Sequence, residues 1–252
     1  MLSQGQKATL KDTSEEGGIY KMNIDVSGRV FQTYISKDGK YLFTSGIDLD
    51  QKIEAPTQPK QTEIPKTYKP KVQLFVMSQC PYGIQAEEPM SEILKLLKDK
   101  IDFELNFIAT ANSDGTFSSL HGQPEVDGDL MQVCAMKQYP DKYFDFIICL
   151  NKDSKNMDKN WEQCAKDNSL DANKLGKCWQ GSEGKELLKE NVKAAEENDV
   201  SGSPTLLING ANYQGQRTSE AFKQGICSGF SSQPSECSQT LTSQTATASG
   251  NC

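Results

Sequence analysis

The feature that most constrains the fold is a strand–helix–strand succession between residues 71 and 109. The run KVQLFVM (71–77) is continuously apolar and rich in β-branched residues, which is typical of a strand buried on both faces. A helix is predicted at 83–99, with apolar residues at helical spacing, and IDFELNFIA (101–109) predicts a second strand. A βαβ unit of this kind implies two parallel strands.

The second half of this sheet is predicted far along the chain. Residues 125–199 lack any strand pattern and indicate several helices. A strand then follows in TLLING (205–210), a short one near Tyr213, and a helix from Thr218. The prediction is an α/β domain over 71–237 whose sheet is interrupted by a helical insert at about 111–199.

The remaining segments differ in character from this domain. Residues 18–49 alternate apolar and polar residues around Asp-Gly and Ser-Gly turns, which predicts a small antiparallel β unit within 1–50. An N-terminal extension of the main sheet is the alternative. Four prolines make 51–70 an extended linker, and the Ser/Thr/Gln-rich residues 238–252 are predicted to be a disordered tail.

Charge argues against a nucleic-acid partner, and hydropathy argues against a membrane-spanning segment. The formal net charge is −7 at pH 7, and no basic stripe is present to neutralise phosphates, so we expect no nucleic-acid partner. No apolar run reaches the ~18 residues needed to cross a bilayer, and the first residues contain no apolar signal core.

Eight cysteines indicate the compartment. None of the close pairs has C-x-x-C spacing and His121 is the only histidine, so neither a metal site nor another cofactor is expected. The spacings suit disulfides, which persist in oxidising compartments. We therefore expect an extracytoplasmic protein whose signal or membrane anchor is absent from this sequence.

Cys80 is the residue with the clearest chemical role. It comes directly after the buried strand, and Pro81 occupies the first position of the following helix. The free N–H groups and the dipole of a helix N-terminus stabilise an anion, so the thiol pKa should fall below its free value of ~8.5. These surroundings favour a nucleophile; the alternative is a small hydrophobe at a strand end.

These residues carry a resemblance. FVMSQCPYG (75–83) followed much later by GSPT (202–205) resembles the thioredoxin-fold thiol–disulfide oxidoreductases, and the helical insert is similar to that of the DsbA type. His121-Gly122-x-x-Glu125, followed by Cys134, resembles the histidine–glycine segment of the lysosomal thiol reductases (GILT-like proteins). The N-terminal β unit resembles the small domain of periplasmic disulfide isomerases, which implies a homodimer through that unit.

The resemblance implies roles for several residues. Pro204 would be a cis-proline facing Cys80, and its loop would bind an extended segment of a cysteine-containing protein or peptide. The implied substrate-binding residues are Pro81, Tyr82, Gly83, Ser203 and Pro204.

One position departs from the family motif. The motif is C-x-x-C, whereas residue 83 is Gly83. Without a second motif cysteine, a mixed disulfide on Cys80 waits for another thiol. An external thiol reductant is therefore expected. Cys134 is the candidate resolving thiol within the chain; the alternative is that it forms a structural disulfide. His121 is a candidate auxiliary group; the alternative is that it is a surface-loop residue.

The remaining cysteines are expected to be structural. Four of them lie in the helical insert and form two pairs, in any of three connectivities: Cys134, Cys149, Cys164 and Cys178. Cys227 and Cys237 bracket a Ser- and Pro-containing loop and are predicted to pair. Cys80 and Cys252 are left over, and Cys252 is expected either to be incidental or to pair between chains.

Three functions are compatible with these features. The first is a thiol–disulfide exchange enzyme, reductase- or isomerase-like, with Cys80 as its single nucleophile. The second is a non-catalytic peptide-binding or chaperone-like module. The third, peroxidase chemistry, ranks lowest because Arg29 and Arg217 are the only arginines and neither lies near Cys80 in the sequence.

Overall fold

The computed structural model describes residues 8–26, 29–43, 63–241 and Cys252. The chain divides into two compact units, Met1–Pro59 and Lys60–Cys252. Within the described part no helix is long and apolar enough to cross a membrane.

The N-terminal unit is an antiparallel sheet in the order β1-β2-β3-β4. Its strands are β1 (Ala8–Glu16), β2 (Ile19–Val26), β3 (Arg29–Ser36) and β4 (Leu42–Phe43). The sequence predicts this antiparallel sheet but not β1, whose residues are mostly polar. The predicted unit extends to residue 49, and residues 44–49 lie outside the described residues.

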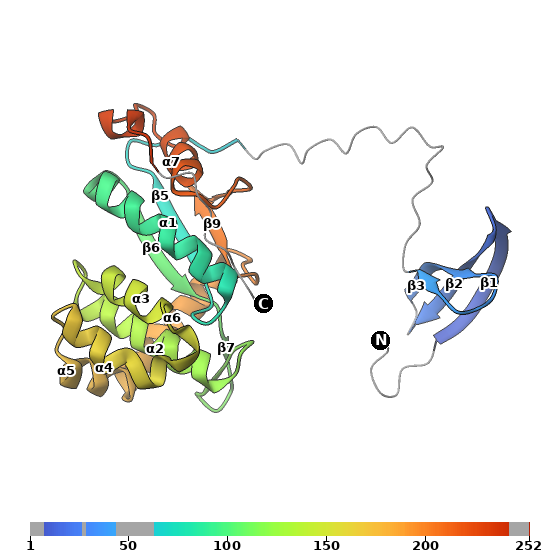
Figure 1. Cartoon of the computed structure of the whole chain (residues 1–252), viewed down its shortest axis with the longest axis horizontal. Coiled ribbons are helices and arrows are strands. Elements are labelled where there is room, and N and C mark those ends of the chain that lie inside the picture. Colours follow the sequence, from blue (N-terminus) through green and yellow to red (C-terminus); the bar gives the residue numbers. More distant parts are fainter. Residues whose placement is uncertain (1–7, 27–28, 44–62, 242–251) are drawn as a thin grey trace. The chain divides into compact units, whose positions relative to one another are not determined.

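The main sheet confirms the predicted α/β fold. Its strand order is β10-β9-β5-β6 (Figure 1), with β5 (Lys71–Val76) in the middle. β5 runs parallel to β6 (Asp102–Phe107) and antiparallel to β9 (Thr205–Ile208). β10 (Ala211–Asn212) continues from β9 through the turn at Asn209-Gly210.

Helices cover both faces of this sheet. α1 (Pro81–Leu97) leads, through the short 3-10 turn Lys98–Lys100, from β5 to β6. Leu74 of β5 belongs to the main core, which also contains buried side chains of α1 and of α7 (Ser219–Ser228). The adjacent Phe75 points to the other face, where it packs with Ala195 of α6 (Ser182–Glu197). Alternate residues of β5 are thus buried on opposite faces, as its mostly apolar sequence predicts.

The predicted helical insert lies between β6 and β9. A small hairpin, β7 (Thr110–Ala111) and β8 (Phe117–Ser118), comes first. The helices that follow are α2 (Gln123–Gln138), α3 (Tyr143–Asn151), α4 (Met157–Asp167), α5 (Ala172–Trp179) and α6, with a 3-10 turn at Ser154–Asn156. Trp161 and Trp179 pack edge to face in the core of this block.

The predicted linker and tail are partly attached to the main domain. Residues 51–62 and 242–251 lie outside the described residues. The Pro65 carbonyl accepts a hydrogen bond from Asn209 Nδ2, so the segment before β5 is already held by the domain. After the 3-10 turn Ser235–Ser238, Leu241 N donates to Glu220 Oε2 at 2.7 Å. The ordered chain therefore extends beyond the predicted start of the tail at 238.

Candidate active site

Cys80 lies at the junction of β5 and α1, where it is the N-cap residue of the helix. Its Sγ accepts a hydrogen bond from Gly83 N at 3.4 Å, and Pro81 occupies the first turn. The residue is fully buried. The sulfur therefore lies at the positive end of the α1 dipole and accepts a hydrogen bond from a backbone N–H of the first turn, as the sequence predicts.

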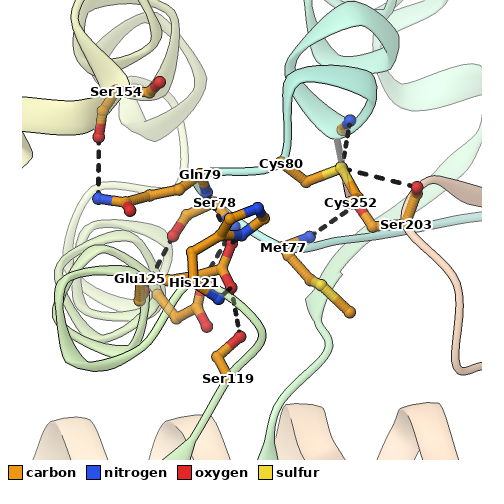
Figure 2. Close-up of polar contacts among 12 residues, drawn as sticks. Met77, Ser78, Gln79, Cys80, Ser119, His121, Glu125, Ser154, Ser203 and Cys252 are labelled. Carbon is orange, nitrogen blue, oxygen red and sulfur yellow. Dashed lines mark hydrogen bonds and ion pairs between the residues drawn. A yellow bond between two sulfur atoms is a disulfide. The ribbon is translucent and has the colours of Figure 1, made fainter. Parts of the chain in front are cut away.

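Cys80 is disulfide-bonded to Cys252, as Figure 2 shows. The two residues are 172 positions apart in the chain, and their Cα atoms are 5.6 Å apart. The expectation that Cys252 is incidental or pairs between chains was wrong. Sequence reasoning missed this pair because no spacing rule connects residues so distant.

The loop before β9 faces Cys80. The Ser203–Pro204 peptide bond is cis, and the Ser203 carbonyl oxygen lies 3.7 Å from Cys80 Sγ. The disulfide leaves that sulfur no proton to donate, so this contact becomes a hydrogen bond only when the thiol is reduced. Ser203 Oγ accepts a hydrogen bond from Met77 N at 3.0 Å, which ties the loop to the end of β5.

Gly83 lies beneath this loop and is buried. A Cβ added there would lie 2.9 Å from Ser203 Oγ and 3.1 Å from the Met77 carbonyl oxygen. Both distances are shorter than ordinary van der Waals contacts. The position that would carry the second cysteine of a C-x-x-C motif is thus crowded by the Ser203 loop and the end of β5. The Gly83 N–H is itself bonded to Cys80 Sγ.

Tyr82 and Pro204 border the accessible side of the site. The Tyr82 side chain is exposed, and the Arg217 guanidinium lies 5.9 Å from the centre of its ring. Arg217 and Pro204 also line a surface pocket of about 280 Å³ together with Tyr213. An aromatic ring and a cation therefore stand beside the cis-proline loop.

Glu125 organises the segment that precedes Cys80. Its fully buried carboxylate accepts hydrogen bonds from Gln79 N at 3.0 Å, Ser119 Oγ at 2.5 Å and His121 N at 3.1 Å. The His121 Nδ1 atom lies 2.8 Å from Glu125 Oε1. His121 is consequently no isolated surface-loop residue, because this contact connects it through Glu125 to the residue before Cys80 (Figure 2).

A second buried carboxylate holds the adjacent residue. Asp129 Oδ1 accepts from Ser78 N at 3.2 Å, and Ser78 Oγ donates to the Glu125 carbonyl oxygen. Burial raises the pKa of Asp129 well above its ordinary value, with the nearby Glu125 carboxylate contributing in the same direction. Helix α2 therefore fixes the turn 78–79 through two acidic side chains one helical turn apart.

A third buried acid lies in α1. Burial raises the pKa of Glu87 to about 8, against the opposite effect of a 2.7 Å hydrogen bond from Asn151 Nδ2. By contrast, Glu104 is partly exposed and pairs with Lys71 and Gln73. The buried acids of the site thus come from α1 and α2 rather than from the sheet.

The other cysteines are all bonded away from Cys80. Cys134 is bonded to Cys178, and both are buried, so the structure does not place Cys134 at the site as a resolving thiol. The other disulfide of the insert joins Cys149 to Cys164. Cys227, for which the sequence predicts a pairing with Cys237, is bonded to that residue.

Two family models match the main domain. Residues 71–168 match the family described as gamma interferon inducible lysosomal thiol reductase (GILT), and residues 132–226 match the DSBA-like thioredoxin domain. No curated protein gives a significant match.

Three solved structures are similar to this chain at low sequence identity. MdbA, a thiol-disulfide oxidoreductase from Actinomyces oris, superposes with a TM-score of 0.51 at 13% identity, covering 67% of this chain and 83% of its own. BdbD from Bacillus subtilis gives a TM-score of 0.49 at 16% identity, covering 65% of this chain and 90% of its own. The oxidoreductase NmDsbA1 from N. meningitidis gives a TM-score of 0.45 at 14% identity, covering 61% of this chain and 79% of its own.

Proposed function

We propose that this chain, which matches the GILT and DSBA-like thioredoxin domain models over parts of its main domain, is an extracytoplasmic thiol–disulfide exchange protein. Cys80 is its nucleophile, and its substrates are cysteine-containing proteins or peptides. The observation that carries the proposal is the position of Cys80 Sγ, which accepts the Gly83 N–H at a helix N-terminus and faces the Ser203–Pro204 loop.

The reaction begins from the reduced form of Cys80. An external thiol first opens the Cys80–Cys252 disulfide. The Cys80 thiolate, stabilised by the Gly83 N–H and by the dipole of α1, then attacks one sulfur of a substrate disulfide. A bond forms between Cys80 Sγ and that sulfur, the substrate S–S bond breaks, and the second substrate sulfur leaves as a thiolate.

The cis-proline loop supports binding of an extended peptide. Backbone groups around Ser203 and Pro204 lie beside Cys80, where they offer hydrogen bonds to an added strand. Pro81 and Tyr82 form the other side, and the Tyr82 ring and Arg217 would contact substrate side chains. Gly83 contributes through its N–H bond to Cys80, since its Cα is covered by the loop.

Two further features support the proposed setting. Four disulfides in one chain favour an oxidising compartment.

The N-terminal β unit exposes apolar side chains at Val30, Phe31, Leu42 and Phe43, which supports self-association of the chain through that unit. Sedimentation of the full chain, compared with the Phe31→Ser and Leu42→Ser double variant, tests the dimer: the wild type should sediment as a dimer and the variant as a monomer.

The decisive experiment traps a substrate on Cys80. The Cys252→Ser variant, which cannot re-form the Cys80–Cys252 bond, is reduced and mixed with a peptide that contains one internal disulfide, and mixed disulfides are located by mass spectrometry. We expect the peptide on Cys80 and at least a tenfold loss of peptide reduction in Cys80→Ser. The matched control removes a remote disulfide, Cys149→Ala with Cys164→Ala, and should retain the reaction.

The same experiment decides between exchange and binding. A protein that binds the peptide reversibly, leaves its disulfide intact and behaves the same after Cys80→Ser would be a peptide-binding module, and the exchange proposal would be wrong.

A further inference from the structure

We propose that Cys252 is the resolving thiol of this protein and replaces, from a remote part of the chain, the missing second cysteine of the motif. The inference rests on the proposed function of Cys80. It goes beyond that function by assigning the residue that completes the reaction within the same chain.

The first observation is the bond itself. Cys252 is disulfide-bonded to Cys80, which shows that its sulfur reaches the proposed nucleophile. All eight cysteines of the chain lie among the described residues, and none of them is free. The other six are paired with one another. Cys252 is therefore the one thiol of the chain that the structure brings to Cys80.

The second observation concerns position 83. A resolving cysteine three residues after the nucleophile would need a Cβ there, and such a Cβ would lie 2.9 Å from Ser203 Oγ and 3.3 Å from Val76 Cβ. A side chain at position 83 would therefore be crowded by its neighbours. Cys252 reaches Cys80 from a remote part of the chain and avoids that position.

The third observation is exposure. Cys80 is fully buried, whereas Cys252 is exposed. A thiol that reduces the oxidised protein therefore meets Cys252 at the surface, and Cys80 is the leaving thiolate that α1 stabilises through the Gly83 N–H. The pair thus has the asymmetry of a working dithiol, with one accessible sulfur and one stabilised sulfur.

The reaction balances over two exchange steps. Cys80 first holds one substrate sulfur in a mixed disulfide, and the other substrate sulfur has left as a thiolate. The Cys252 thiolate then attacks Cys80 Sγ, the Cys80–Cys252 bond forms, and the bond to the substrate breaks. The substrate leaves with two thiols, while Cys80 and Cys252 together lose two electrons. An external dithiol restores the reduced pair and is itself oxidised to a disulfide.

The experiment uses the full chain and oxidised glutathione as the probe. Limiting dithiothreitol is added until two thiols per chain are free, and mass spectrometry of peptides identifies which disulfide has opened. We expect the Cys80–Cys252 bond to open before the buried Cys134–Cys178 bond. If the Cys80–Cys252 bond resists reduction until the other disulfides have opened, it is a structural crosslink and the inference is wrong.

The reduced protein is then given one equivalent of oxidised glutathione. The wild type should release two glutathione thiols per chain and regain the Cys80–Cys252 bond. Cys252→Ser should release one and retain glutathione on Cys80, with a mixed disulfide at least tenfold longer-lived. The matched control, Ser238→Ala, alters an exposed residue of the C-terminal region and should behave as the wild type.

The outcomes separate the two proposals. A wild type that keeps glutathione on Cys80 as long as Cys252→Ser does would overturn the role of Cys252 and leave Cys80 as a monothiol nucleophile. Absence of any adduct on Cys80 in Cys252→Ser, with unchanged glutathione reduction in Cys80→Ser, would overturn the proposed function itself.

Discussion

Ser203 Oγ lies close to the space that a side chain on Gly83 would need, because a Cβ added to Gly83 would lie 2.9 Å from it. The same hydroxyl accepts the Met77 N–H at 3.0 Å, so it cannot rotate away without leaving that N–H unpaired. The absence of a side chain at residue 83 is therefore what allows the cis-proline loop to lie over the start of α1.

This contact predicts a cost for any side chain at position 83. Gly83→Ala should lower the free energy of unfolding by about 1–3 kcal/mol, the usual range for overpacking. Gly202→Ala is the matched control, since nothing lies within 4 Å of an added Cβ there. Urea denaturation of both variants measures the difference; equal stabilities would show that the loop simply moves aside.

A double-mutant cycle tests whether Ser203 causes the cost. The Gly83→Ala substitution should be less destabilising in a Ser203→Ala background, because the opposing oxygen is gone. Additive effects of the two substitutions would assign the cost to the Met77 backbone instead, because the Met77 carbonyl oxygen lies 3.1 Å from the added Cβ.

The Glu125 carboxylate predicts a second effect. In Glu125→Gln, an amide NH₂ replaces one oxygen that faces hydrogen-bond donors, so the N–H groups of Gln79 and His121 compete for one acceptor. We expect a loss of about 1.5–3 kcal/mol in the free energy of unfolding and slower alkylation of reduced Cys80, whose preceding residue loses its anchor. Glu88→Gln, at an exposed position of α1, is the control. Wild-type stability in Glu125→Gln would contradict this role.

Glu87 predicts a pH dependence of stability. Its pKa is raised to about 8 by burial, so between pH ~4.5 and ~8 the folded state keeps a proton that the unfolded state has lost. Stability therefore falls as the pH rises through this window, by up to about 1.4 kcal/mol per pH unit from this group, and the loss is complete above pH ~8. In Glu87→Gln this contribution should vanish.

Urea denaturation at pH 5, 6.5 and 8 measures this contribution as the difference in slope between the wild type and Glu87→Gln. Glu88→Gln should follow the wild type. Parallel curves for the wild type and Glu87→Gln would show that the Glu87 proton is not retained on folding.

The sequence predicts the sheet and Cys80 because both depend on local patterns. The apolar run of β5 and the Cys80-Pro81 junction are read within a few residues, and the helical spacing after them locates α1. The residues that surround Cys80 could not be predicted in this way. Cys252 and Glu125 reach the site through tertiary contacts between residues far apart in the sequence, and no periodicity of the sequence encodes such contacts. The His121 segment is found only through its family resemblance, which names the residues but not their contacts.

Gly83 also shows what one sequence cannot reveal. The sequence shows that residue 83 is not a cysteine. The structure shows that a side chain there would be crowded by Ser203, a residue 120 positions later in the chain. A departure from a motif is visible in one sequence; its compensation depends on the fold.

The disulfides that do not involve Cys80 give a last prediction, on their separate roles. Removing the buried bond with Cys134→Ala and Cys178→Ala should lower the free energy of unfolding by about 2–4 kcal/mol, because the bond closes a long loop, with a sequence separation of 44. Removing Cys227–Cys237, with a separation of 10, should cost less on the same grounds. Because Cys134 is bonded away from the site, peptide exchange at Cys80 should persist in both variants at temperatures where they stay folded. Loss of exchange from a folded Cys134→Ala/Cys178→Ala protein would contradict this and return Cys134 to the reaction.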